Sequence, residues 1–304
     1  MTRILPWLLV CLAVSAPTGA ARAQGESPPA SFEASALRVE NLVGVLEVEV
    51  VEGTVMTVER SGTEELLEEI EMEVDDGVLV IRRDKSLLDR PPRETFKWRD
   101  RYPTVTVRLP AGSAVEIREA IGRALIGDLD GPLVVNATWL AAEVGNVSEA
   151  DVELSGRASL KLGRVAGTLR AKLNSSGDLV AAALGAAEIH KSGSGDLRLG
   201  PIAGSLKYES AGSGDGEVAS VSGPVEAYIN GSGNLSLGGG RAEPLIVKIT
   251  GSGDFVLNGE AVDADLTVGG SGRVILGAHK GTLRLREFTG TLTTSDDGTL
   301  EIAQ

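Results

Sequence analysis

The stretch from Gly231 to Leu237, GSGNLSL, is one of six near-copies of one short phrase in the second half of the chain. The other copies read SSGDLVA, GSGDLRL, GSGDGEV, GSGDFVL and GSGRVIL. Their shared glycines are spaced by 18, 19, 19, 20 and 19 residues and are Gly177, Gly195, Gly214, Gly233, Gly253 and Gly272. Such a period is typical of a solenoid, in which each unit buries its apolar face only against its neighbours.

Apolar residues alternate with polar ones on both sides of this glycine. Around Gly233 the alternating positions hold Val225, Ala227, Leu235 and Leu237. Alternation with period two predicts one strand on each side of the phrase, with one face of each strand turned toward a shared interior. A coil of about 19 residues with two short strands and tight corners is typical of a parallel β-helix, whose rungs stack about 4.8 Å apart.

The phrase itself is predicted to be a corner of each rung. Glycine is expected there because it adopts a positive φ without a Cβ penalty. Serine precedes the glycine in every copy, so the stacked rungs are expected to carry a row of hydroxyls along one edge.

The N-terminal part of the chain has a different pattern. Alternation at Leu46, Val48 and Val50 predicts strands, and Thr63 before an apolar and acidic run predicts the start of one short helix. Residues 84–101 are charged, contain two adjacent prolines and are expected to form an exposed loop. We therefore expect an N-terminal strand-rich cap segment over residues 24–102. A β-helix repeat region over residues 103–304 would continue it as one unit.

The first 23 residues are predicted to be a signal peptide. Arg3 precedes an apolar run from Ile4 to Val14, and Ala21-Arg22-Ala23 offers small residues around a cleavage point. No later segment has the roughly 18 uninterrupted apolar residues of a spanning helix, so no membrane span is expected in the mature chain. The protein is therefore expected in the periplasm, at the cell surface or outside a bacterium.

Composition excludes several classes of site. Cys11, the only cysteine, lies in the predicted signal peptide, so the mature chain would have neither a disulfide nor a cysteine metal site. The net charge is −14, and nucleic acid is not an expected partner because binding to phosphates needs clustered Lys and Arg.

The chain resembles a family of exported bacterial proteins, the putative auto-transporter adhesin head domain or GIN domain. The resemblance rests on LVGVLEVEVVEGTVMTVERSG, IEMEVDDGVLVIRR, YPTVTVRLP and repeats such as YINGSGNLSL and ITGSGDFVLNG, in this order. It implies a right-handed β-helix without established catalytic activity and an adhesin-like or envelope-associated role. The charged loop around Pro91-Pro92 departs from the family pattern.

The residues after the shared glycines are the first candidate site. In order they are Asp178, Asp196, Asp215, Asn234, Asp254 and Arg273. Stacked carboxylates about 5 Å apart would repel one another, while Asn234 would interrupt the column and Arg273 would neutralise its end. Two interpretations stay open. The column is either a solvated turn ladder, in which each Asp accepts N–H groups of its own turn, or a calcium ladder with ligands Asp178, Asp196, Asp215 and Asp254.

The second candidate is the aromatic cluster of Phe96, Trp98 and Tyr102, which is either a binding tip or part of the packing under the first rung. His190 and His279 are expected at the surface, because no nucleophile spelling accompanies them. No catalytic residue and no cofactor are expected.

Three functions remain possible at this point. The leading hypothesis is a non-catalytic exported β-helix that binds a polymer, glycan or protein of the cell envelope. The second is a carbohydrate-active enzyme of the polysaccharide lyase or hydrolase type, which needs converging carboxylates. Candidates for that role are Asp128, Asp130, Glu143 and Asp151. The third is a structural or regulatory periplasmic module that binds another protein.

The signal peptide gives a direct prediction: the mature protein begins near Gln24, because cleavage follows the small residues of Ala21-Arg22-Ala23. N-terminal sequencing of the protein recovered from the periplasm or medium of an expressing bacterium checks this. Exported protein that still begins with Met1 would contradict it.

Overall fold

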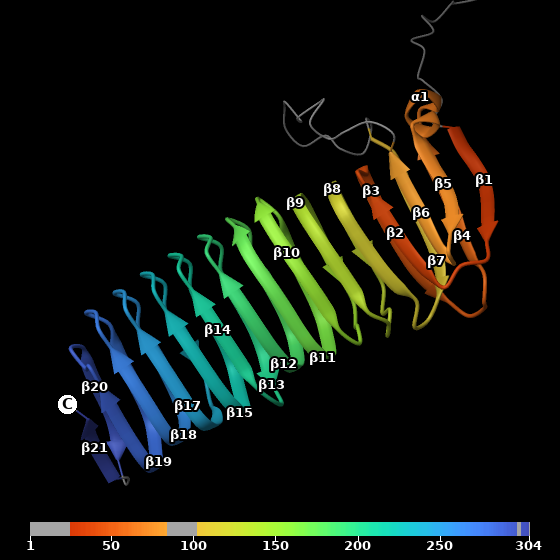
Figure 1. Cartoon of the computed structure of the whole chain (residues 1–304). Helices are drawn as coiled ribbons and strands as arrows, with labels where there is room; N and C mark the ends of the chain where they lie inside the picture. The colour runs from red at the N-terminus through yellow and green to blue at the C-terminus, as the bar shows by residue number, and fades with distance from the viewer. Residues whose placement is uncertain (1–24, 84–101, 297–298, 304) are drawn as a thin grey trace, which may run out of the picture.

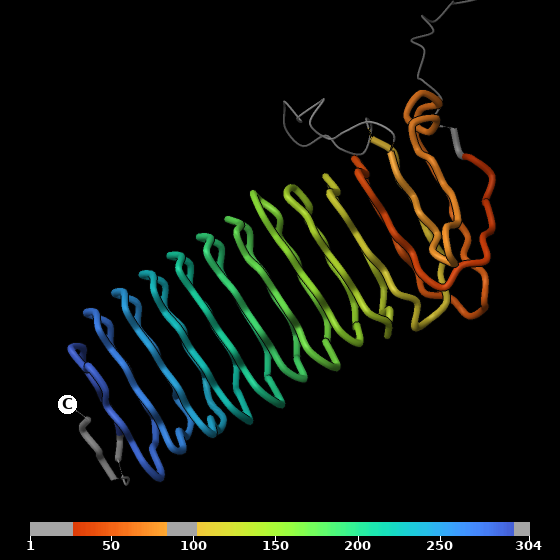
Figure 2. Tube along the Cα trace, in the orientation of Figure 1, coloured from red at the N-terminus to blue at the C-terminus, as the bar shows by residue number. Residues whose placement is uncertain are grey.

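The chain forms an elongated β-solenoid of about nine turns with rungs of about 19 residues. The computed structural model describes residues 25–83, 102–296 and 299–303. Figure 1 shows the rungs side by side along one axis, with the N-terminal strands at one end and the C-terminal strands at the other. The same path is visible as stacked coils in Figure 2. The all-β parallel β-helix predicted from the repeat is therefore confirmed.

Parallel pairing between successive rungs builds the repeat region. Its strands are β11 (Ser159–Ser175), β12 (Leu179–Lys191), β13 (Leu197–Ile202), β14 (Leu206–Ser210), β15 (Gly216–Ile229), β16 (Leu235–Leu237), β17 (Gly240–Ile249), β18 (Phe255–Val268), β19 (Arg273–Arg286), β20 (Thr291–Asp296) and β21 (Thr299–Ala303). The corner phrase divides each rung into a first layer before the phrase and a second layer after it. Val225 stacks on Leu206 in the first layer, and Leu235 stacks on Gly216 in the second.

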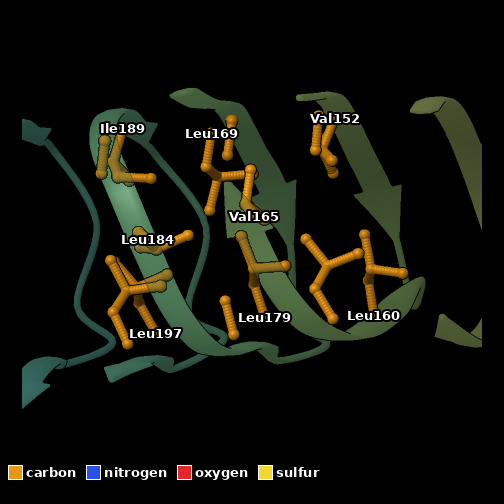
Figure 3. Close-up of a cluster of buried hydrophobic side chains, with 14 of the residues drawn as sticks. Val152, Leu160, Val165, Leu169, Leu179, Leu184, Ile189 and Leu197 are labelled. Carbon is orange, nitrogen blue, oxygen red and sulfur yellow. The ribbon is translucent and has the colours of Figure 1, made fainter. Parts of the chain in front are cut away.

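The core lies between these two layers. The inward positions predicted from the alternation of the six repeats are buried, and Leu235 is fully so. Figure 3 shows Leu169 and Ile189 of the first layer facing the same interior as Leu179 and Leu197 of the second. Because each rung is only two strands wide, this core is one continuous apolar column along the solenoid.

Two irregular residues of the repeat compensate for each other. Tyr208 replaces a smaller side chain in a first-layer column and is fully enclosed. Gly216 replaces the large apolar residue of the second-layer column, and a Cβ built on it would lie 3.1 Å from the Tyr208 hydroxyl oxygen. The ring of Tyr208 therefore occupies the space that Gly216 leaves, which keeps the interior filled.

Lys191 interrupts the apolar interior. It stacks between Leu173 and Ser210, is 2% exposed, and donates from Nζ to the carbonyl oxygens of Gly193 and Gly214. Burial lowers the pKa of the Lys191 ammonium, while the charges of Asp196 and Asp215 act in the opposite direction.

The shared glycines serve close packing and not a positive φ, so the prediction for them was wrong. None of the six has a φ in the left-handed region. A Cβ on Gly233 would come far closer than 3.0 Å to the carbonyl oxygen of Gly214 one rung earlier, and Gly253 stands in the same relation to Gly233. A second column, which includes Gly212 and Gly231, shows the same contact. The corner needs glycine because stacked backbones meet there without room for a side chain.

The N-terminal strands do not stack in chain order. They are β1 (Gly25–Phe32), β2 (Ala36–Glu40), β3 (Val43–Val51), β4 (Met56–Gly62), β5 (Ile70–Asp75), β6 (Val78–Arg83), β7 (Thr104–Pro110), β8 (Ala114–Ile126), β9 (Leu133–Val144) and β10 (Ala150–Gly156). The rung of β2 and β3 lies between β6 and β7 on one side and β8 on the other. Strands from both sides of residue 102 therefore share one stack.

Antiparallel pairing closes this end of the solenoid. β4 pairs with β1 and β7, and β5 pairs with β6, all antiparallel. The predicted short helix is present as α1 (Glu64–Glu68), with Thr63 at its N-cap. In the part of the chain that the structure describes, no helix has the length and hydropathy needed to cross a bilayer.

The glycine contact predicts a sharp difference between neighbouring residues. Gly233→Ala should lower the melting temperature by several degrees, because relieving the clash with the Gly214 carbonyl costs about 1 to 3 kcal/mol. Ser232→Ala, at an exposed adjacent position, should leave it unchanged. Thermal melts followed by circular dichroism compare the two, and equal melting temperatures would refute the packing role of the glycine.

Candidate functional site

The Asp column forms a hydrogen-bonded ladder between rungs. Oδ1 of Asp178 accepts from the backbone N–H of Asp196 at 3.0 Å, and Oδ1 of Asp196 accepts from that of Asp215 at 3.1 Å. Asn234 continues the ladder, since its Oδ1 accepts from Asp254 N–H at 2.9 Å. Each side chain thus bonds to the next rung and not to its own turn, which corrects the expected geometry.

Arginine side chains neutralise the charge of aspartates in this ladder. The Arg198 guanidinium lies 3.4 Å from Oδ2 of Asp178 and 3.1 Å from Oδ2 of Asp196. At the end of the column Arg273 binds Oδ2 of Asp254 at 2.6 Å, as its position in the sequence suggested. Hydrogen bonding from Arg273 holds the pKa of Asp254 below its ordinary value. Within the described residues, no group of three or more His, Cys, Asp or Glu side chains is arranged to hold a metal ion.

A groove of about 650 Å³ lies on the outer face of the first layer, over β2 and the first-layer parts of β8 to β12. In its centre the outward residues of β9 are Val134 and Asn136. The outward residues on either side are Glu116 and Arg118 of β8 and Asp151 and Glu153 of β10. Val134 and Asn136 are shorter than Glu116, Arg118 and Glu153, and the surface is hollow between these longer side chains.

Ion pairs compensate much of the charge in the groove. Glu116 binds Arg38 at 2.7 Å and Arg118 at 2.6 Å, and Asp151 lies 3.7 Å from Arg170. Burial would raise the pKa of Glu116, but hydrogen bonds from the two arginines outweigh it and hold that pKa below its ordinary value. Glu116 is therefore ionised at neutral pH.

Trp139 is an exposed aromatic side chain that the sequence analysis missed. It is 46% exposed, and the Arg157 guanidinium lies 5.7 Å from the centre of its ring. Ala137 stacks with Leu154, and Gly156 stacks with Ser175. In this register Trp139 and Arg157 lie at the corner that the serine phrase occupies in later rungs. The available signal was the alternation in β9, which shifts phase between Ala137 and Leu140 and leaves Trp139 outside the core pattern.

The other predicted residues lie apart from one another. Phe96 and Trp98 are outside the described residues, and Tyr102 is half-buried. The prediction that both histidines are at the surface holds for one of them. His190 lines the groove, and its Nδ1 lies 2.9 Å from Oε2 of Glu209. His279 of β19 is buried, with 2% of its surface exposed.

The four acids considered for catalysis do not converge. Asp151 lies on the first layer, and Glu143 lies on the second, beside Lys161 at 3.7 Å and next to a separate hollow of about 580 Å³. Asp128 and Asp130 are in the turn between β8 and β9, where Oδ1 of Asp128 accepts from the N–H of Asn146. The arrangement therefore does not assemble a pair of facing carboxylates from these residues.

The ladder geometry predicts the response to calcium. Millimolar calcium should leave the melting temperature unchanged, because the Asp oxygens already bind backbone N–H groups and arginines. An ion bound to the folded state at a hundred times its dissociation constant would add about 2.7 kcal/mol.

The matched control is the double variant Asp196→Asn with Asp215→Asn, since Asn234 shows that an amide oxygen can serve the ladder. A calcium-dependent rise of several degrees that this variant abolishes would establish a calcium ladder instead.

Several solved structures are similar to this chain at low sequence identity. A putative adhesin from Bacteroides fragilis NCTC 9343 is 12% identical, with 93% of this chain and 99% of that chain covered and a TM-score of 0.36. A putative lipid binding protein from Parabacteroides distasonis ATCC 8503 is 14% identical, with 91% and 97% covered and a TM-score of 0.37. No curated protein is significantly similar in sequence.

The family model described as "Putative auto-transporter adhesin, head GIN domain" matches residues 38–224 and 216–277. These ranges cover most of the solenoid, from β2 to the first part of β19. The chain therefore belongs to the family of the auto-transporter adhesin head GIN domain.

Proposed function

We propose that this protein is an exported, non-catalytic binding module of the adhesin type, which uses the outer face of its solenoid to hold a partner in the bacterial envelope or outside the cell. Family membership supports the adhesin type. The signal peptide expected at residues 1–23 lies outside the described residues and supports export.

The single observation that carries the proposal is the groove over β8, β9 and β10. It is a preformed hollow of about 650 Å³ whose polar groups stand on strands of a stacked sheet. The backbone of such strands is fixed, and ion pairs restrain side chains such as Glu116, which lowers the conformational entropy lost on binding. A rigid polar surface of this kind suits recognition.

The enzyme hypothesis receives less support from the same groove. A glycosidase needs one carboxylic acid that stays protonated near neutral pH and a second carboxylate across the scissile bond. Glu116, a half-buried acid of the groove, has a lowered pKa because hydrogen bonds from its two arginines outweigh its burial. A general acid needs a raised pKa, so the lowered pKa of Glu116 does not suit this role.

The proposal predicts retention without turnover. Immobilised mature protein should retain a component of an envelope extract or of the culture medium, and should release no reducing ends or unsaturated sugars from polysaccharides.

The matched variant carries Asp151→Lys and Glu153→Lys, two changes at exposed positions that line the groove. They reverse its local charge while the inward face of β10 stays intact. The variant should retain less of that component. Sustained turnover, or equal retention by the variant, would overturn the proposal.

A further inference from the structure

Strand β9 exposes apolar side chains on the outer surface, where the neighbouring strands carry charged ones. The described residues expose four large apolar side chains, and two of them, Val134 at 38% and Trp139 at 46%, belong to β9. Asn136 stands between them on the outer face. At about 3.3 Å per residue, the chain from Val134 to Trp139 is at most about 17 Å long, since it turns at the corner. The strand thus presents an apolar, amide and aromatic row from the groove to the corner.

The ring of Trp139 is held in place. Arg157 lies over it at 5.7 Å in a cation–π contact, and the hydroxyls of Thr138 and Ser155 beside it are 3.0 Å apart. Neighbouring strands thus fix the corner on which the ring stands. An exposed and preorganised ring of this kind costs little conformational entropy when it binds a ligand.

Groups that can bind hydroxyls flank the row. Glu116 and Arg118 lie on one side of it, and Asp151 and Glu153 lie on the other. Glu116 is paired with arginines and Asp151 lies near Arg170, so the charges of these two carboxylates are compensated while they still offer acceptors. The surface therefore suits a ligand rich in hydroxyls and without strong net charge.

We propose, building on the proposed function, that the β9 row binds a neutral oligosaccharide lying along the strand from the groove to the corner. Trp139 packs against the C–H face of one sugar ring. Asn136 and the paired charges on β8 and β10 bind hydroxyls of the neighbouring sugars. A row of at most about 17 Å accommodates a few sugar residues and not a long chain.

Charge disfavours the alternatives. The chain carries a net charge of −14, which repels acidic polysaccharides. A cationic peptide would have to compete with arginines that already hold the groove carboxylates, among them Arg38 and Arg118. Both ligand classes are included in the test as contrasting probes.

The test uses the mature chain with Trp98→Phe, in which Trp139 is the only tryptophan. Chitotetraose and cellotetraose are the neutral probes, oligogalacturonate is the acidic probe and tetralysine is the cationic probe. A neutral probe should change the emission of Trp139 saturably. Calorimetry should then show affinity weaker by about tenfold or more in Trp139→Ala, the loss typical of a truncated aromatic anchor.

Trp139→Phe should keep part of the affinity, and Asn136→Ala should lose part of it with an unchanged melting temperature. The Trp98→Phe change should not weaken binding, which separates β9 from the aromatic cluster of the sequence analysis. The inference fails if neither neutral probe binds, if the acidic or cationic probe binds more tightly, or if Trp139→Ala binds as well as its parent. If Trp139→Ala still retains the envelope component, the proposed function stands and only the assignment to β9 fails.

Discussion

The regular rungs, and with them most of the solenoid, depend on the close contact of glycine backbones at the corner. At Gly214 and Gly233 the chain passes so near the carbonyl of the preceding rung that a Cβ would overlap it. This contact sets rung against rung in one register, and the parallel hydrogen bonds between strands then extend along both layers. A corner with side chains in these positions would hold the strands apart.

The fixed register turns every sequence position into a column. Inward columns become a continuous apolar core, and the column after the glycine becomes a ladder in which Asp or Asn accepts the N–H of the next rung. Arg198 and Arg273 then neutralise carboxylates that would otherwise repel one another. In the regular rungs these polar side chains therefore stabilise the stack through hydrogen bonds and ion pairs between rungs.

The proposed binding surface lies where the repeat is least regular. At β9 the charged outward residues of neighbouring rungs give way to Val134 and Asn136, and the corner serine gives way to Trp139. These substitutions open a groove and expose a ring without disturbing the inward face, because inward and outward residues alternate. The solenoid thus supplies rigidity, and one irregular strand supplies the surface on which the proposals rest.

The sequence by itself determined the all-β solenoid, its period and its inward face, because each depends on short-range alternation repeated at a fixed interval. It did not reveal why the corner positions are glycine. The contact between Gly214 and Gly233 joins residues 19 positions apart, and in the sequence a glycine that packs closely cannot be told from a glycine that forms a turn. The order of β2, β3 and β7 in the stack and the groove around Asn136 were also decided only by the tertiary structure. Both arise from neighbours that stacking brings together, and no local pattern in the sequence records which strands become neighbours.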